Sequence, residues 1–267
     1  MKSNHVLDNF AEFVALNWTD ASWVVPELNA NNLEDLKSRY RWNGATYEEN
    51  TMELDQLSKG LLTALDRNDC GEARSHCIDI LKWGGVLPKN YRGSYSNKTL
   101  SPRSKLGQII EQKTLENELC RWIDHSLCLA KSGRIDEFNS KGYISNSSMT
   151  KVHSLADKEA FFIIYDTRVA AALCFLVKIF LRSQGVLHTP PLLQFGRTPG
   201  NKPVRDATEP PYKFSRYYNY SLHAKYNYLS SVVVLKAQSM LDGVTSRDIE
   251  ASLFMLGQDL DQIKFEV

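Results

Sequence analysis

The longest apolar stretch of the 267-residue chain runs from Val169 to Leu181, and a single lysine interrupts it. A transmembrane helix needs about 20 apolar residues, so this stretch is too short to cross a bilayer. A segment that is apolar on every side without spanning a membrane is typical of a buried helix. We therefore expect a helix over residues 167–182 at the centre of the fold, with Asp166 or Thr167 as its N-cap.

The rest of the chain carries the spacing of further helices, with apolar residues recurring three and four positions apart. The clearest case is Thr51 to Leu65, and β-type alternation is limited to Phe161 to Tyr165. The other expected helices cover residues 9–18, 32–36, 70–83, 106–110, 115–129, 149–155, 222–241 and 246–256. The sequence thus predicts an all-α fold of about ten helices, either as one unit over 1–267 or as two helical subdomains with the site between them.

The N-terminus, MKSNHVLDNFAEF, places acidic residues where a signal peptide needs an apolar block. We therefore expect a cytoplasmic protein with no membrane partner. The cysteine count is odd and no pair has C-x-x-C spacing, which favours reduced core thiols over disulfides or metal ligation. The six histidines form no metal-binding pattern, so we expect no metal and no cofactor. The cysteines are Cys70, Cys77, Cys120, Cys128 and Cys174.

The net charge of +1 is unevenly distributed along the chain. Residues 87–113 hold six Lys or Arg against one Asp or Glu, and residues 178–236 hold nine against two. Residues 1–86 hold eight against fourteen. Two basic segments in an otherwise balanced chain suggest a surface that binds a polyanion. The alternative is a solvated surface on which the fold brings acidic residues alongside the basic ones.

Lys151 precedes the apolar run Phe161 to Tyr165 and Asp166 follows it, and each has a structural and a chemical interpretation. Asp166 is a favoured N-cap, because the helix dipole stabilises an anion there. Lys151, on a short helix, is by residue type alone a solvated residue. A lysine that is partly buried near an anion behaves differently, because desolvation lowers the pKa of an amine and the neutral amine is a nucleophile. Such an amine can attack C1′ of a deoxyribose or form a Schiff base.

A second candidate region begins with the Pro-rich loop over residues 185–211. A loop of this length inside a folded domain is usually functional or disordered, and its residues Gly196, Arg197 and Lys202 favour a function. The run Tyr212 to Tyr220 then interleaves aromatic and basic side chains outside helical spacing. This arrangement suits stacking on a base while holding phosphates, although a purely structural role is the other interpretation.

Two short motifs resemble the helix-hairpin-helix DNA glycosylases, most closely the 8-oxoguanine glycosylase branch. In that family a Gly-x-Gly-Thr-Lys hairpin carries a nucleophilic lysine, and a strand-like apolar segment leads to an Asp-x-His-Val motif at a helix start. Here Thr150-Lys151 and Asp166-Thr167-Arg168-Val169 stand at those places. Ser147, Ser148 and Met149 replace the hairpin glycines, and Arg168 replaces the histidine. The resemblance covers roughly residues 115–183, and without a terminal cysteine cluster no iron–sulfur cluster is expected.

The resemblance implies a DNA glycosylase, a hydrolase of N-glycosyl bonds, that flips a modified base out of double-stranded DNA and leaves an abasic site. Lys151 would attack C1′, or form a Schiff base with lyase activity. Asp166 would stabilise the positive charge that develops on the sugar. The implied DNA contacts are Ser147, Ser148, Arg168, Arg197, Lys202, Lys213 and Arg216. The implied base pocket contains Phe195, Tyr217 and Tyr218.

A diverged glycosylase of this kind is similar to bacterial antiviral defence enzymes that remove glucosylated cytosines from phage DNA, and the Pro-rich loop would give room for a bulky base. The rival interpretation is a non-catalytic helical module that binds nucleic acid or another protein. In that case Lys151 is a surface residue and Asp166 is only a helix cap.

Overall fold

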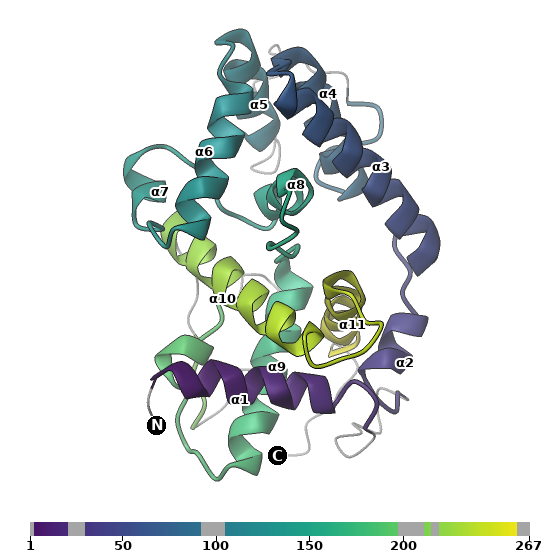
Figure 1. Ribbon diagram of the computed structural model, residues 1–267, viewed down its shortest axis with the longest axis vertical. Coiled ribbons are helices and arrows are strands. Elements are labelled where there is room, and N and C mark those ends of the chain that lie inside the picture. The colour runs from purple at the N-terminus through teal and green to yellow at the C-terminus, as the bar shows by residue number, and fades with distance from the viewer. Residues whose placement is uncertain (1–2, 21–29, 92–104, 197–210, 215–218, 261–267) are drawn as a thin grey trace.

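The structure, a computed structural model, describes residues 3–20, 30–91, 105–196, 211–214 and 219–260. Within these ranges the chain forms eleven α-helices and no β-strand, so the predicted all-α fold is confirmed (Figure 1). The helices are α1 (Ser3–Leu16), α2 (Leu33–Ser38), α3 (Tyr47–Asp66), α4 (Cys70–Trp83), α5 (Lys105–Leu115), α6 (Leu119–Lys131), α7 (Glu137–Ser140), α8 (Met149–Ala156), α9 (Thr167–Ser183), α10 (Tyr220–Gln238) and α11 (Ser246–Asp259), with a short 3₁₀ turn η3 (Pro191–Leu193) after α9.

Side-chain caps set several helix starts. Three cap side chains accept a hydrogen bond from the backbone N–H three residues on: Asn32, Asp69 and Thr245. The helix expected from residue 51 starts earlier, because Thr46 and Glu49 form a capping box ahead of it. The break between α5 and α6 falls at Asn117, whose φ of 56° lies in the left-handed region, rather than at 111–114 as the spacing predicted.

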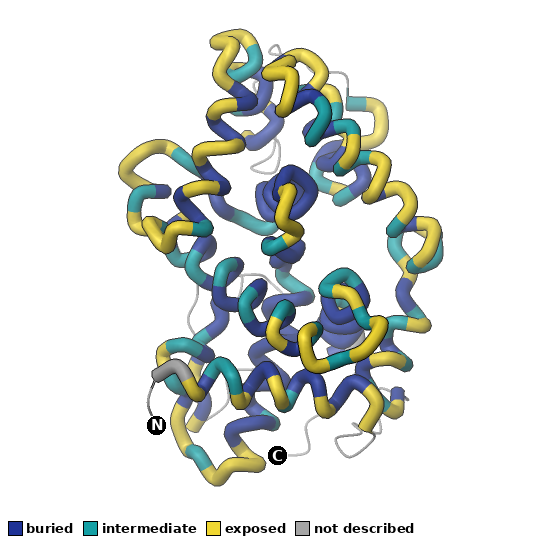
Figure 2. The backbone as a smooth tube through the Cα atoms, viewed as in Figure 1, coloured by how far each residue is buried: buried dark blue, intermediate teal, exposed yellow. Residues whose placement is uncertain are grey.

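The helices enclose two hydrophobic clusters. The first cluster is built by α1, α2, α9, α10 and α11, and the second cluster mainly by α3 to α8. Helix α9 buries twelve of its seventeen residues, and eleven of these belong to the first cluster. Helix α8 lies near the middle of the view in Figure 1, and Figure 2 shows it as buried. Every residue of α8 is buried, so this short helix is covered on all sides.

An extended segment, residues 161–165, runs between the two clusters. Its side chains alternate, because Phe162 and Ile164 belong to the second cluster whereas Ile163 and Tyr165 belong to the first. Such alternation is the period of an extended chain. Both faces of the segment are therefore covered, which explains why its sequence is apolar at every position.

Asp157 fixes the entry to this extended segment. Its Oδ2 accepts hydrogen bonds from the backbone N–H groups of Phe161 and Phe162 at 2.9 and 3.1 Å. Its Oδ1 accepts from the N–H of Glu159 at 3.1 Å and forms an ion pair with Lys131. This carboxylate is occupied by the backbone and by one lysine, so its role is structural.

The next two backbone N–H groups of the segment donate to side chains of two helices. In a β-sheet, a neighbouring strand would accept these hydrogen bonds. The N–H of Ile163 donates to Ser231 Oγ of α10 at 3.1 Å, and the N–H of Ile164 donates to Glu250 Oε2 of α11 at 2.8 Å. Buried N–H groups need a partner, and these two bonds fix the segment relative to both helices. The only alternating run in the sequence is therefore an extended segment and not a strand.

The five cysteines are free thiols, and four of them are buried as predicted. Cys128 is the exception and is exposed. Cys70 and Cys120 are in contact, with their sulfur atoms 3.5 Å apart. Among the described residues, no helix has both the length and the apolar character that a membrane crossing requires.

Gly257 allows α11 to approach the first turn of α9. A Cβ at this position would lie 1.9 Å from the carbonyl oxygen of Arg168 and 2.5 Å from its carbonyl carbon. These are backbone atoms, which cannot swing aside as the end of a side chain can. We predict that Gly257→Ala lowers the free energy of unfolding by about 1–3 kcal/mol, the range typical of overpacking, as measured by urea unfolding.

The matched control is Gly71→Ala in α4, where the nearest atom to an added Cβ is a side-chain oxygen at 3.4 Å. Alanine favours a helix over glycine by up to about 1 kcal/mol, so this variant should be neutral or more stable. Equal stability of the two variants would contradict the close approach of α11 to α9.

Candidate active site

Lys151 and Asp166 line the same two neighbouring cavities. The smaller, which we call the inner cavity, has a volume of about 40 Å³, and the outer cavity has a volume of about 250 Å³. Both are also lined by Trp42, Gly84 and Arg168. The lysine comes from α8 and the aspartate from the residue before α9, so the fold brings the two predicted catalytic residues to one place.

The side chain of Lys151 is held inside the protein. The residue is only 7% exposed, and its Nζ donates to the carbonyl oxygen of Ser147 at 2.9 Å. Its methylene stem passes directly over Gly84, where an added Cβ would lie 2.4 Å from Cδ of the lysine. Lys151 is therefore not a solvated surface residue, contrary to the interpretation from residue type alone.

Two local interactions position the lysine helix. Asn146 Oδ1 accepts from the backbone N–H groups of Ser148 and Met149 at 2.9 and 2.8 Å, so its side chain caps the start of α8. Thr150 Oγ1 donates to the carbonyl oxygen of Tyr165 at 3.2 Å. This last bond joins the neighbour of the lysine to the neighbour of the aspartate, and so it fixes the two catalytic candidates relative to each other.

Asp166 is the N-cap of α9, as predicted. Its Oδ1 accepts from the backbone N–H groups of Arg168 and Val169 at 2.8 and 3.1 Å. Its Oδ2 lies 3.5 Å from the guanidinium of Arg168. The residue is 8% exposed. One oxygen thus holds the helix start, and the second oxygen lies beside the guanidinium of Arg168.

The turn at Trp42 and the end of α4 form another wall of both cavities. Trp42 Nε1 and Asn43 Nδ2 each donate to the carbonyl oxygen of Trp83 at 2.8 Å. Asn43 and Gly44 have φ values of 54° and 86°, which makes the turn tight and places Trp42 beside the end of α4. Gly84, the residue that follows α4, also lines the site.

Four aromatic rings line the inner cavity, and we call them the aromatic cage: Tyr40, Trp42, Trp83 and Phe254. The guanidinium carbon of Arg168 lies 4.7 Å from the ring centre of Phe254 and 5.2 Å from that of Trp42. Both distances are within the range of a cation–π contact. The cage could not be predicted, because aromatic residues that line a cavity look the same in a sequence as ordinary core residues.

A second carboxylate, Glu250 of α11, also lines the inner cavity and was not predicted. Its Oε1 lies 2.8 Å from the guanidinium of Arg247, while Oε2 accepts from Ile164. Burial raises the pKa of Glu250, with a further contribution from Asp166, and the Arg247 ion pair opposes the shift. Burial and the charge of Glu250 also raise the pKa of the Tyr40 hydroxyl. Two carboxylates, Asp166 and Glu250, thus line this cavity, and each lies beside the guanidinium of an arginine.

The remaining predicted site residues fall in four groups. Ser147 and Ser148 line the outer cavity with Arg168. Phe195 lines neither cavity, because it is fully buried in the first cluster with its ring centre 6.1 Å from that of Phe10. Lys213 is exposed. The others lie outside the described residues: Arg197, Lys202, Arg216, Tyr217 and Tyr218.

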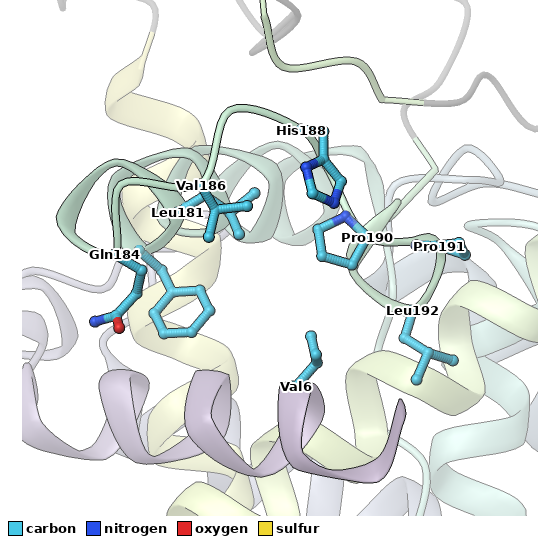
Figure 3. A pocket seen from close by; sticks show the side chains of 9 residues that line it. Val6, Leu181, Gln184, Val186, His188, Pro190, Pro191 and Leu192 are labelled. Carbon is cyan, nitrogen blue, oxygen red and sulfur yellow. The ribbon is translucent and has the colours of Figure 1, made fainter. Parts of the chain in front are cut away.

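A larger cavity elsewhere has a different character. It has a volume of about 540 Å³ and lies between α1 and the chain that follows α9 (Figure 3). Val6, Leu181, Pro190 and other apolar groups line it, and Gln184 and His188 are its polar lining residues. This lining does not combine a nucleophile with an acid. Over the described part of the chain, no three His, Cys, Asp or Glu side chains gather as a metal site would require.

Comparison with protein families, with curated proteins and with solved structures gave no match to this chain. The site is therefore interpreted from its own geometry.

Two buried histidines lie close to this site. His223 Nδ1 is 3.0 Å from Ser145 Oγ, and His153 Nε2 is 2.8 Å from Ser126 Oγ. Burial lowers the pKa of His153 to about 4. Burial, with smaller contributions from His153 and the positive charge of Lys151, lowers the pKa of His223 to about 3. Both imidazoles are therefore neutral at neutral pH.

These shifts predict a loss of stability in mild acid. The ordinary histidine pKa of about 6.5 applies to the unfolded chain, so the unfolded chain takes up protons first as the pH falls. The free energy of unfolding has its full value above about pH 6.5. By pH 5, protonation of each histidine in the unfolded chain should have lowered it by roughly 2 kcal/mol. Urea unfolding at both pH values measures the loss. The loss of unfolding free energy between the two pH values should be smaller in His223→Gln. It should be unchanged in His125→Gln, because His125 is exposed. Equal losses in both variants would contradict the assignment.

Proposed function

We propose that the protein is a DNA glycosylase that cleaves the N-glycosidic bond of a modified base in double-stranded DNA and leaves an abasic site. The observation that carries the proposal is that a buried lysine and a buried aspartate line one pair of cavities. These residues stand where the two glycosylase-like motifs place a nucleophile and a carboxylate. Burying an amine costs free energy that a purely structural position avoids by using an apolar residue, which supports a chemical role for Lys151.

The proposed reaction begins when the target base leaves the stack and C1′ of its sugar reaches the lysine. The neutral amine of Lys151 attacks C1′, the C1′–N bond to the base breaks, and its electron pair leaves with the base. The base takes up one proton and the amine gives up one. The sugar becomes oxocarbenium-like as the bond breaks, and the buried carboxylate of Asp166 stabilises that charge in a medium of low dielectric constant.

A monofunctional variant of this reaction replaces the amine by water. Water adds at C1′, the base again leaves with the bonding electron pair, and the proton lost by water balances the proton that the base takes up. Asp166 then orients the water as well as stabilising the sugar. The two routes differ in one observable, a covalent bond between Lys151 and the DNA.

Phosphate contacts would lie at the rim of the outer cavity. Ser147, Ser148 and Thr167 line it, and they stand at the starts of α8 and α9. Serine and threonine side chains are common donors to the phosphate oxygens of DNA. The basic segments of the sequence would extend this contact along the duplex. The excision of glucosylated cytosine in phage defence remains a prediction, since part of the loop on which it rests lies outside the described residues.

The first test is excision by two variants on DNA that carries modified cytosine, DNA that carries 8-oxoguanine, and unmodified DNA, with new abasic sites counted by an aldehyde-reactive probe. Asp166→Asn should retain the cap and change the unfolding free energy by no more than about 1 kcal/mol, yet slow excision by a factor of roughly 10² to 10³. Lys151→Met keeps the packed stem and removes the amine, so it should fold normally and lose excision by the lysine route.

The matched control is Asp69→Asn, which alters the N-cap of α4 in the same way, because Asp69 Oδ1 accepts from Glu72 N–H at 2.9 Å. This variant should excise at the rate of the unaltered protein. Full activity in both Asp166→Asn and Lys151→Met would refute the site. Absence of abasic sites in every DNA would favour the non-catalytic binding module.

Borohydride trapping separates the two routes. A trapped protein–DNA adduct that disappears in Lys151→Met identifies a Schiff base and a lyase step. Abasic sites without an adduct identify the water route, in which Asp166 carries the charge stabilisation. Trapping at a different lysine would contradict the role of Lys151.

Gly84 provides a geometric test of the same site. An added Cβ would lie 2.4 Å from Cδ and 2.6 Å from Cε of Lys151, so Gly84→Ala must push the flexible lysine stem away. We predict a small change in unfolding free energy and a loss of excision of tenfold or more, on the order of what misplacing a catalytic group causes. Gly71→Ala serves as the control and should retain activity. Unchanged excision in Gly84→Ala would show that Lys151 need not lie where the structure has it.

A further inference from the structure

Three segments enclose the cavity of about 540 Å³ between α1 and the chain that follows α9, which we call the apolar pocket. Val6 of α1 lies on one side of it, and His188 and Pro190 lie on the opposite side (Figure 3). Gln184 and Leu192 lie at its two ends in this view. The volume is within the range of about 300–1,000 Å³ that is typical of small-molecule sites. Voids between packed side chains are far smaller, so the pocket is not a packing defect.

The end of α9 fixes one wall of the apolar pocket. Gly185 has a φ of 65°, and its N–H donates to the carbonyl oxygen of Arg182 at 3.0 Å. The N–H of Val186 donates to the carbonyl oxygen of Leu181 at 2.9 Å. This pair of bonds is the Schellman motif, in which the two end residues commonly make an apolar contact. Val186 and Leu181 are those end residues, and both line the pocket.

Hydrogen bonds from outside the pocket hold the next part of the wall. The hydroxyl of Tyr212 donates to the carbonyl oxygen of Val186 at 3.1 Å, and the backbone N–H of Lys213 donates to Thr189 Oγ1 at 3.3 Å. Pro190 follows with a φ of −59°, which its ring fixes. The wall is therefore held away from α1 and does not collapse to fill the space. A site that is formed before its ligand arrives is typical of small-molecule binding.

The lining changes from apolar inside to polar at the rim. Val6, Phe180 and Leu181 are buried, whereas Gln184 and His188 are exposed. No Lys, Arg, Asp or Glu is among the described residues that line the pocket. An ion that entered would lose its hydration without gaining a counter-charge, which is costly. The pocket therefore favours a molecule without charge, whose apolar body lies inside and whose polar group lies at the rim.

We propose that the apolar pocket is a second binding site, which takes an uncharged, elongated apolar small molecule with one polar group toward Gln184 and His188. The proposal does not depend on the chemistry of Lys151 and Asp166. Asp166 caps the start of α9, and the pocket lies at the other end of this seventeen-residue helix. At 1.5 Å per residue the two sites are separated by about 25 Å.

The first experiment measures binding by fluorescence titration with two matched probes, N-phenyl-1-naphthylamine and 8-anilino-1-naphthalenesulfonate. They share the same rings and the same secondary amine, and they differ by one sulfonate and its negative charge. One molecule of the uncharged probe should bind per protein, at least about tenfold more tightly than the sulfonate, because the sulfonate would be buried without a counter-charge. Equal affinities, or tighter binding of the sulfonate, would overturn the proposed ligand class.

Two variants that fill the pocket test the location. Val6→Trp extends a ring from α1 into the space, and Leu192→Trp extends one from the 3₁₀ turn. Each should weaken the binding of the uncharged probe by about tenfold or more, and the helical signal in circular dichroism shows which of the two folds. The matched control is Leu187→Trp, because Leu187 is 70% exposed and does not line the pocket. This control should bind as the unaltered protein does.

The unaltered protein alone can overturn the proposal. Absence of saturable binding of the uncharged probe, or binding of many molecules per protein, would show that no specific apolar site exists. Unchanged affinity in a folded Val6→Trp or Leu192→Trp variant would place the probe elsewhere and would overturn the assignment of this pocket.

Discussion

The extended segment over residues 161–165 is the constraint on which the site depends. It crosses between two hydrophobic clusters, and its side chains alternate between them. A buried extended chain without a neighbouring strand needs partners for its backbone, and here Asp157, Ser231 and Glu250 accept its N–H groups. Because these acceptors come from different parts of the chain, the end of the segment is fixed, and Asp166 with it.

Close packing then brings the other groups to that fixed point. The bond from Thr150 to the carbonyl of Tyr165 holds the lysine helix against the segment, and Gly84 leaves space for the stem of Lys151. Gly257 allows α11 to touch the backbone of Arg168, which carries Phe254 to the guanidinium. A buried amine, two buried carboxylates and a caged cation are costly to assemble in a core, so their concentration in one place is typical of a functional site.

Much of this could be predicted from the sequence, and the limits have physical causes. Helix caps such as Asp69 and Asp166 were predictable because capping is local, and the all-α class follows from apolar spacing. The burial of Lys151 could not be predicted, since it depends on helices that are distant in sequence. Glu250 and Phe254 were missed for the same reason. Phe195 was predicted for the base pocket, yet an apolar ring is equally suited to the core, and the first cluster contains it.

The measurement that tests the central claim most directly is identification of the released product by mass spectrometry after incubation of the purified protein with a panel of modified duplexes. The account predicts a free modified base in solution, an abasic site of matching amount in the DNA, and far less of both products with Asp166→Asn. A protein that binds these duplexes but releases no base from any of them would contradict the account, and Lys151 and Asp166 would then be parts of a binding surface.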